Sequence, residues 1–83
     1  MFIKVTPIEI NATKWSGKTI LRVNVDYLIG YFEPVDNTGK TRLTLSGYKE
    51  TKRILVKESI QEIDALIEKG DAKVAKLLYG SKL

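Results

Sequence analysis

The sequence predicts an α+β fold, in which about five antiparallel strands form a small curled sheet or barrel and one or two helices follow. Alternating apolar residues, which are typical of strands, recur through residues 1–57. After Glu58 the apolar spacing becomes that of an amphipathic helix. Strands grouped before helices favour antiparallel pairing. At 83 residues the chain is expected to be a single domain, with the sheet in 1–57 and a helical segment in 58–83.

Five segments have the composition and alternation of strands, and they span residues 2–10, 18–25, 28–35, 41–46 and 52–57. Pro7 interrupts the first segment. Because proline donates no hydrogen bond to a ladder, this strand is expected at a sheet edge or with a bulge at Pro7. Polar residues 11–17 and 47–51 predict connections, residues 24–27 a brief turn, and Asp36–Gly39 a hairpin turn.

The helix signal begins at Ser59, which is an N-cap candidate with Glu62 three residues later, as in a capping box. The apolar face consists of Ile60, Ile63, Leu66 and Ile67. Gly70 is expected to end this helix. A second, shorter helix is predicted over 72–79, capped by Asp71, packed through Val74, Leu77 and Leu78, and ended by Gly80.

The composition argues against catalysis. The chain has no cysteine and no histidine, so disulfides, thiolate or imidazole metal sites and the usual general base and strongest nucleophile are all lacking. Three carboxylates, Glu58, Glu62 and Glu68, are expected on the solvated face of the helix, in capping and dipole roles. We therefore expect a non-enzymatic protein without cofactor or metal.

The net charge of +4 comes from 14 basic and 10 acidic residues spread along the chain, as in a soluble protein. No apolar run approaches the roughly 20 residues that cross a bilayer. No membrane association and a cytoplasmic location are the expectations.

The stretch ATKWSGKT, residues 12–19, matches a permissive phosphate-binding loop. Such a loop needs a following helix, whose N-terminus faces the phosphates. Here residues 20–25 alternate like a strand instead. The match is interpreted as a turn.

The third predicted strand has apolar or aromatic residues on both faces. One short helix covers one face of a small sheet, so the sheet must curl into a barrel or receive a second subunit. Leu28, Tyr31 and Phe32 are the candidate oligomer interface.

Two segments combine aromatic and basic residues and are candidates for binding nucleic acid or a protein partner. They are residues 14–18 and 48–53, and the side chains concerned are Lys14, Trp15, Lys18, Tyr48, Lys49, Lys52 and Arg53. The alternatives are that Trp15 folds back to cap the end of the barrel and that the second segment is an ordinary solvated connection.

The pattern Asn24-x-Asp26-x-Leu28-Ile29, followed by a hairpin with alternating leucines and then by residues 56–59 entering a helix, resembles the small flagellar-operon FlbD-like family. The resemblance covers about Val23–Ile67 and implies a small non-catalytic accessory protein. The strand-then-helix order is also loosely similar to LytTR-type DNA-binding domains, at the level of fold only.

The main hypothesis is therefore a small interaction or regulatory module that acts by protein–protein binding with an unknown partner and forms a homo-oligomer. One alternative is a nucleic-acid-binding module that uses the basic and aromatic loops. Another is a structural subunit of a phage or appendage assembly.

Overall fold

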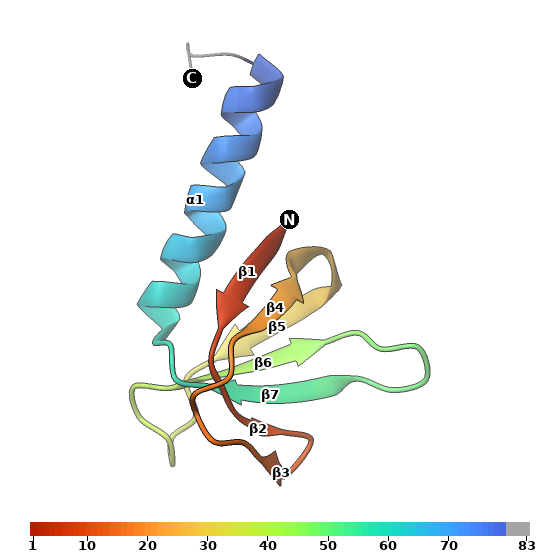
Figure 1. Cartoon of the computed structure of the whole chain (residues 1–83), viewed down its shortest axis with the longest axis vertical. Coiled ribbons are helices and arrows are strands. Elements are labelled where there is room, and N and C mark those ends of the chain that lie inside the picture. Colours follow the sequence, from red (N-terminus) through yellow and green to blue (C-terminus); the bar gives the residue numbers. More distant parts are fainter. Residues whose placement is uncertain (80–83) are drawn as a thin grey trace.

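The computed structural model describes the backbone of residues 1–79 and the side chains of residues 1–70. It confirms the α+β class, since two antiparallel sheets precede one long helix in Figure 1. The strands are β1 (Phe2–Val5), β2 (Pro7–Ile10), β3 (Thr13–Lys14), β4 (Leu21–Asn24), β5 (Leu28–Phe32), β6 (Thr41–Leu45) and β7 (Lys52–Val56). β1 pairs with β4, and the other five strands form a sheet in the order β3-β2-β7-β6-β5.

The sheet is curled but not closed, because no ladder joins the two sheets within residues 1–79. Three runs of chain pass from one sheet to the other: β1 leads into β2, β3 leads into β4, and β4 leads into β5. The five predicted strands become seven for two reasons. The first strand is divided at Thr6, and residues 13–14, predicted as part of a connection, pair with β2.

The bulge predicted at Pro7 is confirmed. The register between β2 and β7 shifts between Pro7 and Glu9. β2 is an interior strand that lies between β3 and β7, so of the two alternatives for Pro7 the bulge is the one that occurs. The bulge alone accommodates the missing N–H of proline.

Glu58 holds the corner between β1 and β2. Its carboxylate accepts hydrogen bonds from the Thr6 backbone N–H, at 2.8 Å, and from the Thr6 hydroxyl, at 3.0 Å. Its own carbonyl accepts from the Thr41 hydroxyl at 2.8 Å. The prediction of a solvated helix residue is wrong for Glu58, because it lies before the helix and is half-buried against the first strands.

The brief turn predicted at residues 24–27 is confirmed as a 3₁₀ turn, η1 (Val25–Tyr27). The Asn24 side chain caps it by accepting from the Asp26 N–H at 3.0 Å. The Ser46 N–H donates to the Tyr27 carbonyl at 2.8 Å, which ties this turn to the end of β6. β5 then pairs with β6, with a second bulge between Leu28 and Gly30.

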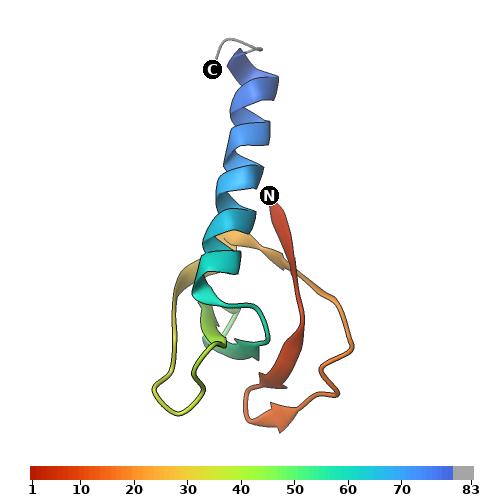
Figure 2. The same ribbon diagram turned by 90° about the vertical axis from the view of Figure 1, so that its left-hand side faces the viewer.

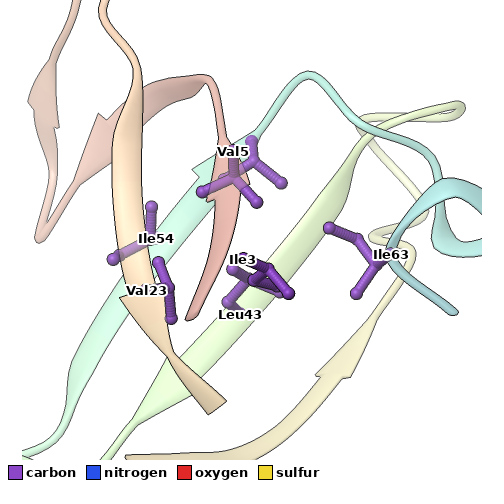
Figure 3. Packing of buried hydrophobic residues seen from close by; sticks show 7 residues of the cluster. Ile3, Val5, Val23, Leu43, Ile54 and Ile63 are labelled. Carbon is purple, nitrogen blue, oxygen red and sulfur yellow. The ribbon is translucent and has the colours of Figure 1, made fainter. Parts of the chain in front are cut away.

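The core lies between the two sheets and the start of the helix, as Figure 3 shows. Strand alternation directs one side chain in two toward it. Its buried members are Ile3, Val5, Val23, Leu43, Ile54, Val56 and Ile63. Leu43 of β6 and Ile54 and Val56 of β7 belong to this set, and Leu45 is half-buried against it.

The helix α1 (Ile60–Tyr79) begins as predicted. The Glu62 N–H donates to the Ser59 hydroxyl at 3.2 Å, and the Ser59 N–H donates to the Glu62 carboxylate at 3.4 Å, which completes a capping box. No helix among the described residues is both long and apolar enough to cross a membrane.

The helix stop predicted at Gly70 is wrong, because α1 continues through it to Tyr79 and no second helix begins within residues 71–79. A glycine inside a helix costs only about 1 kcal/mol relative to alanine. Here a Cβ would overlap the Met1 sulfur, so glycine lets the N-terminal side chain pack on the helix. The first turns of α1 lie against the sheets and its later turns extend beyond them (Figure 2). The predicted packing of Val74, Leu77 and Leu78 and the stop at Gly80 lie outside the described residues.

Candidate functional site

The five-stranded sheet has two edge strands, the two-residue β3 and the five-residue β5, and β5 is the longer free edge. It pairs with β6 on one side and with no strand in the described chain on the other. Its sequence, LIGYF, contains no charge and no proline. Ile29 is 62% exposed and Phe32 is 51% exposed, so β5 presents apolar side chains beside unpaired backbone groups.

The three residues predicted as an oligomer interface have different environments. Leu28 and Tyr31 are half-buried and pack against the core, whereas Phe32 is directed to the opposite face. Ile29, at the bulge, was not predicted, since alternation alone does not show which residue of a bulge turns outward. Phe32 and Ile29 are therefore the accessible side chains of β5.

Tyr31 connects β5 to the helix. Its hydroxyl donates a hydrogen bond to the Asp64 carboxylate. That hydrogen bond raises the pKa of Tyr31 above its usual value, with smaller contributions from burial and from the charges of Asp64 and Glu68. The protonated tyrosine is thus part of the packing between α1 and the sheet.

The seven side chains predicted to bind a partner do not form one surface. Tyr48, Lys49 and Lys52 line a cavity at the end of the curled sheet. Lys52 and Arg53 begin β7, in agreement with the strand predicted over 52–57, and are directed to opposite faces of it.

The outer face of the five-stranded sheet is the face directed away from the core. A row of side chains crosses the whole width of this face. The register aligns them in the order Lys14, Glu9, Leu55, Arg42 and Phe32. Arg53 and Thr44 form part of the next row, and both line a shallow depression with Arg42 and Phe32. Three cations, one carboxylate and one exposed aromatic ring thus share this face.

Leu55 and Arg42 were not predicted as members of this surface. Leu55 is 4% exposed although it faces away from the core, between Glu9 and Arg42 in the row. Long basic side chains can cover apolar surface with their methylene stems. Strand alternation could have indicated Arg42, because it stands between Thr41 and Leu43, which both face inward.

Trp15 and Lys18 lie on the loop that follows β3. The Trp15 N–H donates to the Ile8 carbonyl at 2.7 Å, and the Lys57 ammonium donates to the Gly17 carbonyl at 3.5 Å. This loop therefore lies beside the end of β7, whereas residues 46–51 precede its start (Figure 1). Residues 15–18 and residues 48–51 therefore lie at opposite ends of β7. Trp15 is 43% exposed and is absent from the core cluster.

Residues 12–19 do not have the surroundings of a phosphate-binding loop. Residues 15–20 run from β3 into β4, and no helix follows them. Within the described part of the chain no three acidic side chains come together as a metal site would require.

Comparison with family models, with curated proteins and with solved structures finds no match to this chain. The resemblance to the FlbD-like family therefore stays a prediction.

Proposed function

We propose that this protein is a non-catalytic binding module that acts by protein–protein contact and self-associates through the free edge of β5. The observation that carries the proposal is an uncharged edge strand with two exposed apolar side chains, Ile29 and Phe32. In proteins that stay monomeric, the edge strands are usually protected by charges, by proline, by a bulge or by a covering element. The bulge is the one such device within β5. We propose the cytoplasm as its location.

A second copy of the chain is the partner that we propose for this edge. Two β5 strands related by a two-fold axis pair antiparallel, because each offers the same residues to the other. Phe32 of each copy would then approach β5 of the other, and apolar cross-strand pairs add about 0.2–1 kcal/mol each. Such a contact is isologous and closes as a dimer.

The contact is expected to be weak. A five-residue strand is about 17 Å long, and pairing along that length buries less surface than the roughly 1,200 Å² of a stable interface. We therefore expect a dimer that forms at micromolar or higher concentration.

Analytical ultracentrifugation between about 5 and 500 μM tests the proposal. The expected mass rises from 9.4 kDa toward twice that value. Ile29→Lys and Phe32→Asp each place a charge at the edge and should keep the protein monomeric. Val35→Asp is the matched control, because Val35 is 98% exposed and lies outside β5.

A monomer at every concentration would refute the self-association. So would a dimer that Ile29→Lys and Phe32→Asp leave intact while their circular dichroism matches that of the unchanged protein. A mass that grows without limit would instead favour the alternative of a structural subunit of a larger assembly.

Single-stranded nucleic acid on the outer sheet face is a second candidate function. The favouring observation is that Arg42, Arg53, Lys14 and Phe32 share that face. Base stacking on an aromatic ring beside cations is a common mode of single-strand binding. Glu9, inside the same row, opposes it.

Fluorescence anisotropy of labelled DNA and RNA at two salt concentrations tests this candidate. Binding should weaken steeply with salt, as it does for phosphate contacts. Replacing Arg42 and Arg53 with alanine should weaken nucleic-acid binding more than replacing Lys49 and Lys52 with alanine. The second pair of changes removes the same charge, but from the cavity side of the sheet. Equal losses, or no binding at low salt, would reject the outer face as the site.

A further inference from the structure

The two ends of the curled sheet differ. The helix covers one end, where Ile63 enters the core, and Val23 and Ile54 lie toward the other end in Figure 3. At that other end the sheets line a half-open cavity of about 510 Å³. Ligand sites in proteins usually have volumes of about 300–1,000 Å³, and the mouths of β-barrels are a common place for them.

The floor of this cavity is apolar. It is made by the ends of four strands, which contribute the buried Val23 and Ile54 and three half-buried side chains, Ile10, Leu21 and Leu45. The half-buried residues pack on the core with one side and leave the other side open to the cavity. A ligand on this floor would remove apolar surface from water.

The rim is polar and has an excess of positive charge. Lys49 and Lys52 stand against a single acidic residue, Glu50. Arg22 adds to the lining from β4, and the exposed Tyr27 and Tyr48 lie at the mouth. Lys52 pairs with Leu45 and so is directed to the same side of the sheet as the floor. An anionic group at the mouth would therefore meet more than one cation.

The rim loop has a defined shape. A Cβ on Gly47 would overlap the backbone carbonyl oxygen of Glu50, so only glycine allows this close approach. The close turn leaves Tyr48 99% exposed at the mouth of the cavity. An aromatic ring in that position can cover a bound molecule without any change in the strands.

We propose that this cavity binds an amphipathic organic anion, whose apolar body lies on the floor and whose acidic group lies at the cationic rim. A compact, strongly hydrated anion does not fit the apolar floor, because it would lose hydration without gaining hydrogen bonds there. A neutral apolar molecule would leave the rim charges unused. This site is separate from the edge of β5 and does not depend on the proposed self-association.

Decanoate is the probe for the test, used below its micelle-forming concentration. Isothermal titration calorimetry should give a dissociation constant below about 1 mM, a modest affinity for a ligand of this size. Amide NMR signals of residues 21–27 and 45–54 should shift, and those of 13–18 should not. Shortening the carboxylate by one methylene should weaken binding about fourfold, as expected for a methylene buried on an apolar floor.

Two double variants distinguish the effect of the rim lysines on binding from the effect of the net charge of the protein. Lys49→Glu with Lys52→Glu should weaken decanoate binding at least fivefold. Lys14→Glu with Lys18→Glu changes the net charge equally, away from the cavity, and should change binding less than twofold. Decanol should bind more weakly than decanoate to the unchanged protein and should be insensitive to both double variants.

Leu45→Phe tests the floor, because the larger ring occupies part of the cavity and should weaken decanoate and decanol together. The proposal is overturned if millimolar decanoate shifts no signal in residues 21–27 and 45–54. It is also overturned if both double variants weaken binding equally, or if decanol binds as tightly as decanoate.

Discussion

Replacing Glu58 with alanine should destabilise the fold by about 2–3 kcal/mol. The carboxylate accepts two hydrogen bonds from Thr6, at 2.8 and 3.0 Å, where the chain passes from one sheet to the other. A hydrogen bond to a charged group contributes about 1.5–3 kcal/mol when buried. Because both residues are only half-buried, we take about 1–1.5 kcal/mol for each bond.

The destabilisation expected for Glu58→Ala is a large part of the free energy of unfolding of the whole chain. At roughly 0.05–0.15 kcal/mol per residue, a chain of this size is stable by about 4–12 kcal/mol. A change of 2–3 kcal/mol should lower the melting temperature by about 10–20 °C in a domain of this length. The measurement is urea and thermal unfolding followed by far-UV circular dichroism.

Two further variants make the result specific. Glu58→Gln keeps an oxygen acceptor for the Thr6 N–H and an amide donor for its hydroxyl, so it should cost only about 1 kcal/mol. Glu33→Ala removes the same charge from an exposed loop and should change stability by less than 0.5 kcal/mol. If Glu58→Ala proves as mild as Glu33→Ala, the corner between β1 and β2 does not depend on this carboxylate, and the reasoning is wrong.

Three other changes test the core, the helix start and the tyrosine that joins helix to sheet. Leu43→Ala removes a side chain with no exposed surface and should cost about 2–5 kcal/mol in urea unfolding, whereas a loss below 1 kcal/mol would contradict its central place. Ser59→Ala removes the cap of α1 and should cost about 0.5–2 kcal/mol, with the loss seen in the same unfolding curves. Tyr31 has a raised pKa in the folded state, so its contribution is complete below the usual tyrosine pKa of about 10 and is lost as pH rises through the folded value. The stability difference between the unchanged protein and Tyr31→Phe should therefore shrink at alkaline pH, and a difference that does not vary up to pH 11 would show that the hydrogen bond to Asp64 does not contribute.

The elements of the fold could be predicted because their signals are local. The alternation of Leu43, Ile54 and Val56 predicts an inward face, and Ser59 with Glu62 specifies the first turn of the helix. Gly70 failed as a stop signal because a glycine inside a helix costs only about 1 kcal/mol, and here its lack of a side chain leaves room for Met1.

The surfaces could not be predicted because they depend on register between distant strands. Nothing local aligns Lys14, Leu55, Arg42 and Phe32 in one row, since each comes from a different strand. Lys52 and Arg53 are neighbours in the chain, yet they are directed to opposite faces as soon as β7 begins at Lys52. A basic cluster in the sequence is therefore not a basic cluster on the molecule.

The placement of β2 has a consequence for how the chain folds. β5, β6 and β7 are joined by short connections and can pair as a local meander. β2 must then pair with β7, and the contact between Thr6 and Glu58 spans 52 residues of chain. Loop closure over such a separation is entropically costly, and folds rich in non-local pairing fold in milliseconds to seconds rather than microseconds. Refolding should therefore be limited by the arrival of the N-terminal strands on a preformed meander, so that changes at Thr6 mainly speed unfolding while changes in β6 slow folding.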